Sequence, residues 1–284
     1  MISSNIFVDD VKLDTSKYSD GSIEVKLPLD IKHKECVNIR AVITDVSGIL
    51  LLTYVLEQLQ CMGIKCKLDL PYLPNSRQER SQKTDTCYKP NSFLSFARIL
   101  SNYKTIIESI TIIDPHSEDN ISLLELLGLH VNVISIQDIF PLDNFQNIDY
   151  IISPDEGARK RTSLIATLLN VPMIVARKER NPDNREIELI LNTELDLKDK
   201  NILVVDDIID YGNSLHDLTK ILKENYKVKR ISCFISHAIL SSNLRLTIPS
   251  RTSFALKYVD YFECYNLFNL PGFIDDPFNY TNLL

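Results

Sequence analysis

Short apolar runs rich in β-branched residues alternate with longer segments of helical period along this chain. Such alternation is typical of parallel sheets covered by helices, because parallel strands need long crossover connections. The expected strands are residues 37–43, 66–71, 110–114, 150–153, 172–176, 186–192, 202–206 and 228–235; the expected helices are residues 48–61 and 92–100 and the segments after Gly157 and Asn213. The fold class is therefore α/β.

The chain is long enough for two cores, since domains usually contain on the order of 100–150 residues and this sequence has 284. The strand-and-helix alternation is interrupted near residues 137–146 and then begins again. We therefore expect two similar α/β domains, residues 1–138 and residues 139–284.

Charge and composition exclude several classes of protein. A formal net charge of −7 argues against a protein that binds nucleic acid through a basic face. The sequence has no apolar run long enough to predict a membrane span, and its first residues lack the pattern of a secretory signal. We therefore expect a cytoplasmic protein with no membrane partner. The six cysteines form no CxxC pair and are expected to be reduced.

The most informative segment is NILVVDDIIDYGNSL, residues 201–215, in which an apolar strand is followed by two adjacent acids, a loop and a helix. In open α/β sheets, ligands bind beyond the carboxyl ends of strands. Asp206 and Asp207 can accept hydrogen bonds from vicinal hydroxyls, which a ribose offers. The following loop can supply donors to phosphate oxygens from Asp210, Tyr211, Gly212, Asn213 and Ser214. The alternative interpretation of this segment is purely structural: a strand that ends in acids, followed by an N-capped helix.

VVDDIIDYGNS resembles the PRPP-binding motif of phosphoribosyltransferases and of PRPP synthetases, which are ribose-phosphate diphosphokinases. Three more segments, in the expected order, resemble the synthetases: YSDG at residues 18–21, PYLPNSRQER at residues 71–80 and IIDPHS at residues 112–117. The resemblance spans most of the chain. It implies two tandem type I phosphoribosyltransferase-like domains, each a mostly parallel sheet flanked by helices.

The resemblance also implies roles for the first three segments. The residues that would contact ATP are Tyr18, Asp20, Arg77, Gln78, Arg80 and His116. In the family, the segment that corresponds to Tyr18 and Asp20 reaches ATP on a neighbouring subunit, so the resemblance implies a homo-oligomer, a dimer or larger. Each segment alone could instead be a turn, a solvated charged loop or a structural histidine.

Residues in two further segments match those that the family uses near the metal and on the lid. His116 and Asp155, in SPDEG, match residues near Mg²⁺, which commonly keeps waters and phosphates beside few protein ligands. Lys178 and Arg180, in the polar segment 176–188, match a Lys-x-Arg on a hairpin that closes over the triphosphate. Cations placed where charge develops are what phosphoryl-type transfer requires. An ordinary exposed hairpin is the alternative for this segment.

The resemblance therefore implies an ATP-dependent diphosphokinase that transfers pyrophosphate to the anomeric 1-hydroxyl of a ribose 5-phosphate unit and releases AMP. Its partners would be ATP and ribose 5-phosphate. Tyr211 and Asn213 depart from the small residues and threonine of the family's phosphate loop, and Ser22 replaces an acid. A stacking tyrosine suits a larger acceptor, so ADP-ribose is the second candidate, in which case the product would serve NAD rebuilding.

Three other interpretations stay open. A type I phosphoribosyltransferase shares the DDIID loop but consumes PRPP, and the RQER, DPHS and Lys-x-Arg segments disfavour it. A non-catalytic regulatory subunit resembling the synthetases is disfavoured by the presence of Lys178, Arg180 and both acids. A generic nucleotide-binding scaffold would require four ordered matches to be accidental.

Overall fold

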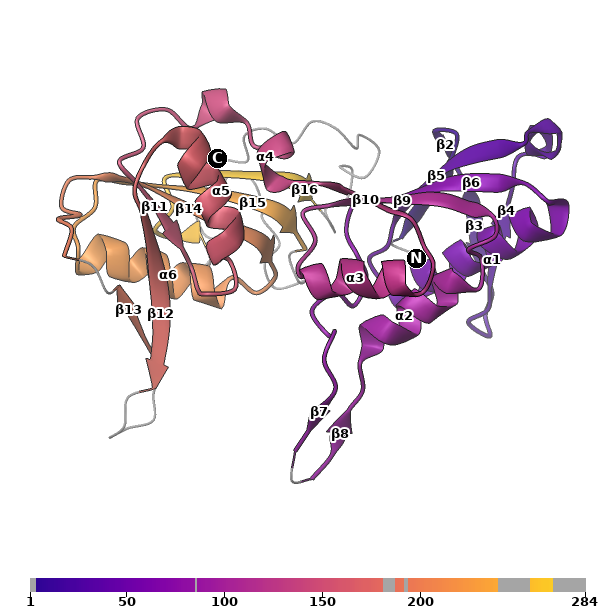
Figure 1. Cartoon of the computed structure of the whole chain (residues 1–284), viewed down its shortest axis with the longest axis horizontal. Coiled ribbons are helices and arrows are strands. Elements are labelled where there is room, and N and C mark those ends of the chain that lie inside the picture. The colour runs from indigo at the N-terminus through magenta and orange to yellow at the C-terminus, as the bar shows by residue number, and fades with distance from the viewer. Residues whose placement is uncertain (1–3, 85, 181–186, 192–193, 240–255, 268–284) are drawn as a thin grey trace. The chain divides into compact units, whose positions relative to one another are not determined.

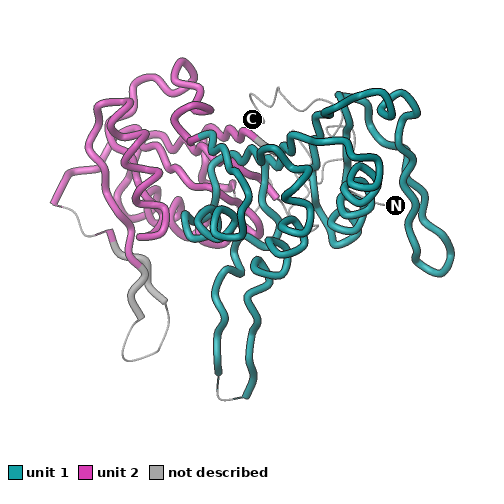
Figure 2. The backbone as a smooth tube through the Cα atoms, turned by 45° about the vertical axis from the view of Figure 1, so that its right-hand side comes forward, with its two compact units in different colours: residues 1–134 teal, residues 135–284 magenta. Residues whose placement is uncertain are grey.

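The computed structural model describes residues 4–84, 86–180, 187–191, 194–239 and 256–267. The chain forms two compact units, Met1–Ile134 and Ser135–Leu284 (Figure 2). The sequence placed the boundary between residues 138 and 139, in a segment that the structure assigns to the second unit. That segment is ordered, because its two phenylalanines, Phe140 and Phe145, are buried and stack with a centroid distance of 4.9 Å.

Unit 1 is a mostly parallel sheet with strand order β10-β9-β6-β5-β1-β2 (Figure 1). The four parallel strands are β5 (Cys36–Val42), β6 (Lys65–Leu70), β9 (Ile107–Ile113) and β10 (Val131–Ile134). The antiparallel edge is formed by β1 (Asn5–Val8) and β2 (Val11–Lys12). The helices are α1 (Val46–Met62), α2 (Ser92–Ser101) and α3 (Glu118–Leu126), and η1 (Leu29–His33) is a 3₁₀ turn.

Two small hairpins complete unit 1. One joins β3 (Asp14–Lys17) to β4 (Ile23–Lys26), and β4 packs against α1. The other joins β7 (Gln82–Lys83) to β8 (Tyr88–Lys89) and projects from the body of the unit (Figure 1). These polar segments lack long apolar runs, and the sequence did not predict them as strands.

Unit 2 has a second mostly parallel sheet, of strand order β13-β12-β11-β14-β15-β16. Its strands are β11 (Tyr150–Ser153), β12 (Met173–Arg180), β13 (Ile187–Leu191), β14 (Asn201–Ile209), β15 (Arg230–Ala238) and β16 (Tyr261–Leu267), of which only β13 is antiparallel to its described neighbour. The helices are α4 (Ile136–Ile139), α5 (Arg159–Leu169) and α6 (Asn213–Glu224), with a 3₁₀ turn η2 (Leu142–Asn144). The predicted α/β class, with mostly parallel sheets flanked by helices, is confirmed.

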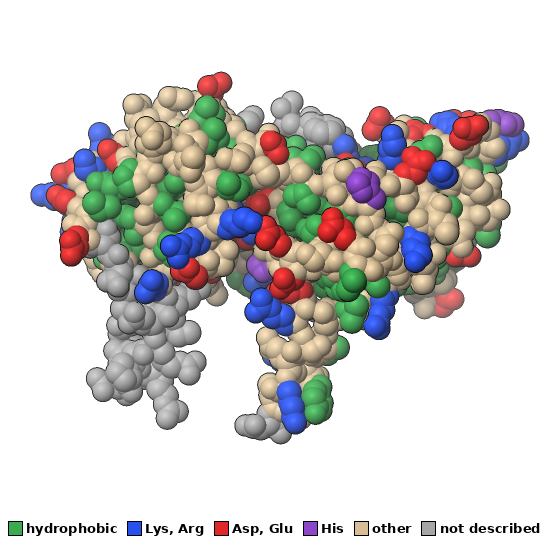
Figure 3. Space-filling view, viewed as in Figure 1, with side chains coloured by type: hydrophobic (Ala, Val, Ile, Leu, Met, Phe, Trp, Pro, Cys, Tyr) green, Lys and Arg blue, Asp and Glu red, His purple; other side chains and the backbone are tan. Residues whose placement is uncertain are grey.

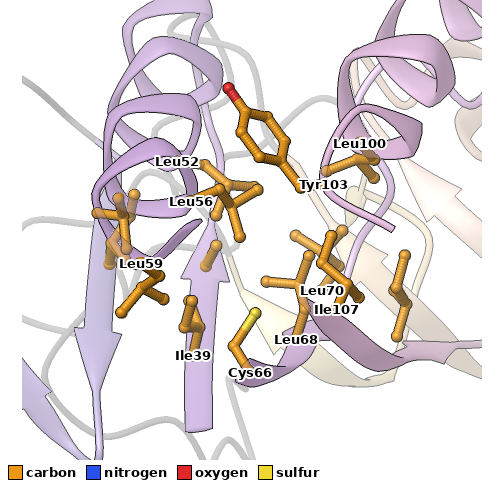
Figure 4. Close-up of a cluster of buried hydrophobic side chains, with 14 of the residues drawn as sticks. Ile39, Leu52, Leu56, Leu59, Cys66, Leu68, Leu70, Leu100, Tyr103 and Ile107 are labelled. Atoms are coloured by element: carbon orange, nitrogen blue, oxygen red, sulfur yellow. The ribbon is translucent and has the colours of Figure 1, made fainter. Parts of the chain in front are cut away.

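The core of unit 1 lies between α1, α2 and the sheet (Figure 4). α1 begins where the Asp45 side chain accepts a hydrogen bond from the Gly48 amide, and it ends at Gly63, whose φ of 70° suits glycine. Its inward face carries Leu52, Leu56 and Leu59, each 1% exposed or less. Burying one such leucine contributes about 1.5–3 kcal/mol, so α1 is fixed chiefly by packing.

The α1 packing predicts the cost of truncating one leucine. Leu56→Ala should lower the free energy of unfolding by about 2–5 kcal/mol, because it leaves a cavity that the rigid sheet cannot fill. Leu50, on the same helix but 44% exposed, provides the matched control, and Leu50→Ala should change stability by only a fraction of that. Urea denaturation followed by circular dichroism measures both, and equal losses would contradict the packing described.

Candidate functional site

In unit 2, the acidic pair lies where β14 extends past one neighbour but not the other. β11 pairs with β14 only as far as Ile152 opposite Val204, whereas β15 pairs with it as far as Ile209 opposite Ala238. The sequence placed the end of this strand at Asp206, but β14 continues to Ile209 because β15 supplies hydrogen-bonding partners there. The two acids therefore lie in the second half of the strand, beyond its last pair with β11 at Val204.

The two carboxyls lie close together in a poorly solvated position. Asp207 is 5% exposed and Asp206 is half-buried, and an oxygen of Asp206 accepts a hydrogen bond from the Asp207 amide at 2.9 Å. Burial, and then the adjacent Asp207 charge, raise the pKa of Asp206 well above its ordinary value; the charge of Arg161 opposes them. Such a raised pKa is commonly found where a protein binds a ligand.

The loop after β14 has the form of an anion-binding turn. Gly212, with a φ of 73°, precedes α6, and the carbonyl of Gly212 accepts the first helical hydrogen bond from the His216 amide at 2.9 Å. The amides of a helix's first turn point along its axis and favour negative charge. Asp210 is half-buried, whereas Tyr211, Asn213 and Ser214 are exposed; the Tyr211 ring is 59% exposed.

Asp155 belongs to the turn after the neighbouring strand β11. Its carboxylate accepts a hydrogen bond from the Ala158 amide at 3.1 Å, and Ser153 donates its hydroxyl to the Asp155 carbonyl at 2.7 Å. Because β11 and β14 are parallel, this turn and the acidic pair lie at the same edge of the sheet. The structure thus brings Asp155 to the edge that carries Asp206 and Asp207.

Lys178 and Arg180 lie on the extension of β12 past that edge. β12 pairs with β11 up to Val175 and then pairs with β13, with Lys178 opposite Leu189 and Arg180 opposite Ile187. The predicted hairpin over residues 176–188 is therefore present as two strands, with residues 181–186 outside the described part of the chain. It rises from the same edge as the acidic pair.

In unit 1, residues 71–80 form a clamped loop after β6. Ser76 is 1% exposed, and its carbonyl accepts a hydrogen bond from the buried Asn120 amide at 2.9 Å. Asn91 donates its side-chain amide to the Glu79 carbonyl at 2.6 Å. Between and beyond these anchors, the side chains of Arg77, Gln78 and Arg80 are exposed. The β7–β8 hairpin continues from this loop and carries basic and apolar side chains at the surface (Figure 3).

His116 lies in the turn after β9, beside that loop. β6 and β9 are parallel, with Leu70 opposite Ile112, so their following turns share one edge. Asp114, 7% exposed, precedes Pro115 with a φ of 35°, a conformation that residues other than glycine rarely adopt and that clusters at functional sites. Arg80 and Asp119 make an exposed ion pair of 3.6 Å between the loop and α3.

Tyr18 and Asp20 are not brought to this edge. They lie in the turn of the separate β3–β4 hairpin, where the Tyr18 hydroxyl donates to Glu24 at 3.1 Å. Asp20 accepts hydrogen bonds from the hydroxyl and the amide of Ser22, at 2.6 and 2.9 Å, and these hold the pKa of Asp20 below its ordinary value. The turn has its own internal order.

Sequence reasoning missed three residues that support these turns. They are Asp114, Asn120 and Arg161, each less than a tenth exposed. A polar residue inside an otherwise apolar helical face was the available signal for Asn120 and Arg161, but only the fold shows which backbone or carboxylate each one meets.

A metal at either edge would need oxygens from a bound ligand. Within the described residues, no three His, Cys, Asp or Glu side chains gather closely enough to hold an ion by themselves. Asp155 offers a half-buried carboxylate and His116 a half-buried imidazole. One carboxylate and one imidazole suit Mg²⁺ that takes most of its ligands from phosphates and water and few from protein. Among the same described residues, no helix is both long and apolar enough to span a bilayer.

Comparison with known proteins agrees with this geometry. The model of the phosphoribosyl transferase domain matches residues 130–260, which include β11, α5, β14 and the loop before α6. A phosphoribosylpyrophosphate synthetase from Mycobacterium smegmatis has the same fold, with a TM-score of 0.67 and 19% identity over 82% of this chain and 76% of that one. The fold is thus that of a phosphoribosyltransferase-like α/β protein.

Curated relatives narrow the class. The ribose-phosphate pyrophosphokinase of Sulfurisphaera tokodaii is 26% identical over 85% of this chain and 81% of its own length. That of Saccharolobus solfataricus is 24% identical over 81% of this chain and 77% of its own length. Over most of its length, this chain is therefore similar to the ribose-phosphate pyrophosphokinases, which are also called PRPP synthetases.

The raised pKa of Asp206 predicts a pH-dependent gain in stability when its charge is removed. Because the folded-state pKa exceeds the unfolded value, the wild-type protein loses stability as pH rises through the folded pKa. Asp206→Asn should therefore raise the melting temperature at pH 8, without substrates, and the gain should vanish as pH falls below about 4. Asp217→Asn, at an exposed position of α6, is the control; differential scanning fluorimetry across pH is the measurement, and a pH-independent gain would contradict the cause given.

The Asn120 contact predicts the cost of freeing the loop. Asn120→Ala should destabilise the fold by about 1–3 kcal/mol, because it leaves the buried Ser76 carbonyl without its donor. Asn132→Ala, at an exposed position of β10, should change stability by less than about 0.5 kcal/mol. Urea denaturation compares the two, and similar small effects would show that the Asn120 contact contributes little.

Proposed function

We propose that this protein is an ATP-dependent diphosphokinase that transfers the β,γ-pyrophosphate of ATP to the anomeric 1-hydroxyl of a ribose 5-phosphate unit and releases AMP. The observation that carries the proposal is the acidic pair on β14, past its last pairing with β11, followed by the amino end of α6. A ribose phosphate suits carboxylates that accept hydrogen bonds from its vicinal hydroxyls and nearby amides that donate hydrogen bonds to its phosphate oxygens. The names of the curated relatives support the same reaction.

The acceptor would be oriented by unit 2. Asp206 and Asp207 would accept hydrogen bonds from the ribose 2- and 3-hydroxyls, and residues Asp210, Tyr211, Gly212, Asn213 and Ser214 would surround the 5-phosphate. ATP would be held by unit 1, where Arg77, Gln78 and Arg80 are exposed on a loop whose backbone is held by hydrogen bonds from two asparagine side chains. Arginine suits this task because its guanidinium donates two parallel hydrogen bonds to phosphate.

In the chemical step, the 1-oxygen of the ribose attacks the β-phosphorus of ATP in line. An oxygen–phosphorus bond forms there, the bond from the β-phosphorus to the α,β-bridging oxygen breaks, and that oxygen leaves with AMP and the electron pair. The hydroxyl proton passes to solvent. Lys178 and Arg180 would stabilise the charge that builds on the transferred phosphates. Asp155 of unit 2 and His116 of unit 1 would each be a candidate ligand for Mg²⁺ carried by phosphate, and the ion would neutralise phosphate charge.

The proposal includes a role for the β3–β4 hairpin. Tyr18 and Asp20 lie in a sheet separate from the loop that carries Arg77. We propose that they complete the adenine site of a neighbouring copy, so that the active species is a homo-oligomer.

ADP-ribose is the second acceptor that a specific observation favours. The Tyr211 ring is 59% exposed in the loop before α6, where the family's threonine would offer only a hydroxyl and a methyl group. A solvent-exposed phenol ring can stack on an adenine that extends from the 5-phosphate. ADP-ribose contains the same ribose 5-phosphate with a free 1-hydroxyl, so the chemistry is unchanged.

The test is an assay of ATP and Mg²⁺ with either ribose 5-phosphate or ADP-ribose, with products identified by mass spectrometry. We expect AMP and a pyrophosphorylated acceptor, and Lys178→Ala should lower kcat by about a hundredfold or more by removing a charge from the transition state. Lys200→Ala, at the residue directly before β14 and at the other end of that strand from the acidic pair, is the control and should retain activity. Tyr211→Thr should weaken the use of ADP-ribose and spare ribose 5-phosphate.

Absence of AMP with both acceptors would refute the proposal. It would favour the non-catalytic regulatory subunit, whereas consumption of added PRPP with a nucleobase would favour a phosphoribosyltransferase.

A further inference from the structure

A buried arginine, Arg161, lies beside the acidic pair, and the reaction described above assigns it no part. It belongs to the first turn of α5 and is 9% exposed, and its Nη2 lies 3.5 Å from Oδ2 of Asp207. Both side chains of this ion pair are more than nine-tenths buried. Burying a guanidinium is costly unless acids pair with it, and Asp207 is one such partner of Arg161.

The helix that carries Arg161 follows the Asp155 turn and contacts the strand that carries the acidic pair. α5 begins at Arg159, directly after the turn that holds Asp155. The next residue after Arg161, Thr162, donates its hydroxyl to the Ala158 carbonyl at 2.9 Å and contacts the Val205 carbonyl at 3.4 Å. Successive residues of α5 thus contact β14 at Val205 and at Asp207, and the placement of Arg161 is fixed by the helix.

The charge of Arg161 offsets repulsion between the two carboxylates. Burial and the charges of Asp207 and Asp155 disfavour ionisation of Asp206, while Arg161 favours it. Without the guanidinium, two adjacent carboxylates would lie in a poorly solvated position with less compensation, and the pair would take up a proton more readily. A protonated carboxyl is a weaker acceptor, so such a pair would hold two hydroxyls less well.

We propose that Arg161 is a positioning residue for the acceptor ribose: its guanidinium fixes the Asp207 carboxylate and keeps the acidic pair competent to accept hydrogen bonds from two vicinal hydroxyls. The inference rests on the proposed function of this site and requires no contact between Arg161 and the substrate. It predicts an effect on acceptor binding and little effect on ATP binding, because the loop residues proposed to hold ATP, Arg77, Gln78 and Arg80, belong to the other unit.

The experiment measures binding rather than turnover. Isothermal titration calorimetry of the full chain gives the Kd for ribose 5-phosphate, for ADP-ribose and for ATP separately. Arg161→Gln should weaken binding of the acceptor by about tenfold or more, equivalent to about 1.4 kcal/mol, and leave ATP within about twofold. Arg161→Lys, which keeps the charge, should recover most of the loss. Arg159→Gln, at an exposed position of the same helix paired only 2.7 Å from Glu156, is the matched control and should bind as wild type.

A double-mutant cycle with Asp207→Asn separates positioning from general folding. If Arg161 acts through Asp207, then Arg161→Gln should add little to the loss already caused by Asp207→Asn. The double variant removes both buried charges, so it also serves if Arg161→Gln alone fails to fold. Additive losses, an equal loss for ATP and acceptor, or unchanged acceptor binding in Arg161→Gln would each overturn the proposal.

The outcome is distinguishable from failure of the proposed function. A wild-type protein that binds ribose 5-phosphate or ADP-ribose but releases no AMP would refute the diphosphokinase reaction, and the Arg161 variants would still support or overturn the positioning role. A wild-type protein that binds neither acceptor would overturn both.

Discussion

Parallel strand pairing is the constraint on which the rest of this molecule depends. When β11, β12 and β14 run in the same direction, their carboxyl ends meet at one edge, and each following turn lies beside the next. The early end of the β11–β14 ladder then leaves β14, from Val205 to Ile209, paired with β15 only. The acidic pair is therefore held by backbone pairing with β15, while no β11 residue pairs with it on the other side. A ligand site needs both a fixed backbone and a side that can receive the ligand.

The candidate site residues also include unfavourable features, and their cost in free energy of folding has to be offset by packing in the two cores. The adjacent carboxyls on β14 repel each other, and Asp114 holds a positive φ before a proline. Such positions persist because well-packed elements around them leave no alternative. In unit 1 the buried face of α1 supplies that packing, and in unit 2 the buried strands β14 and β15 do.

Much of this arrangement was predictable, and the exceptions have physical reasons. The strand at residues 150–153 was predicted with its observed bounds, because a short apolar run between polar turns has few alternatives. β14 and β12 were predicted too short, because their last residues are polar or follow charges and are held as strand only by β15 and β13. The edge strands β1 and β2 were missed, because two- to four-residue strands have too little periodicity to stand out.

Local hydrophobic periodicity was enough to predict the α/β class, and short motifs were enough to suggest the candidate residues. Which side chains support those residues is visible only once the elements are packed together. Asn120 meets the Ser76 carbonyl across 44 positions and Arg161 meets Asp207 through a helix packed on its strand. Contacts between distant segments depend on the packing of whole elements, and no local pattern in the chain encodes them.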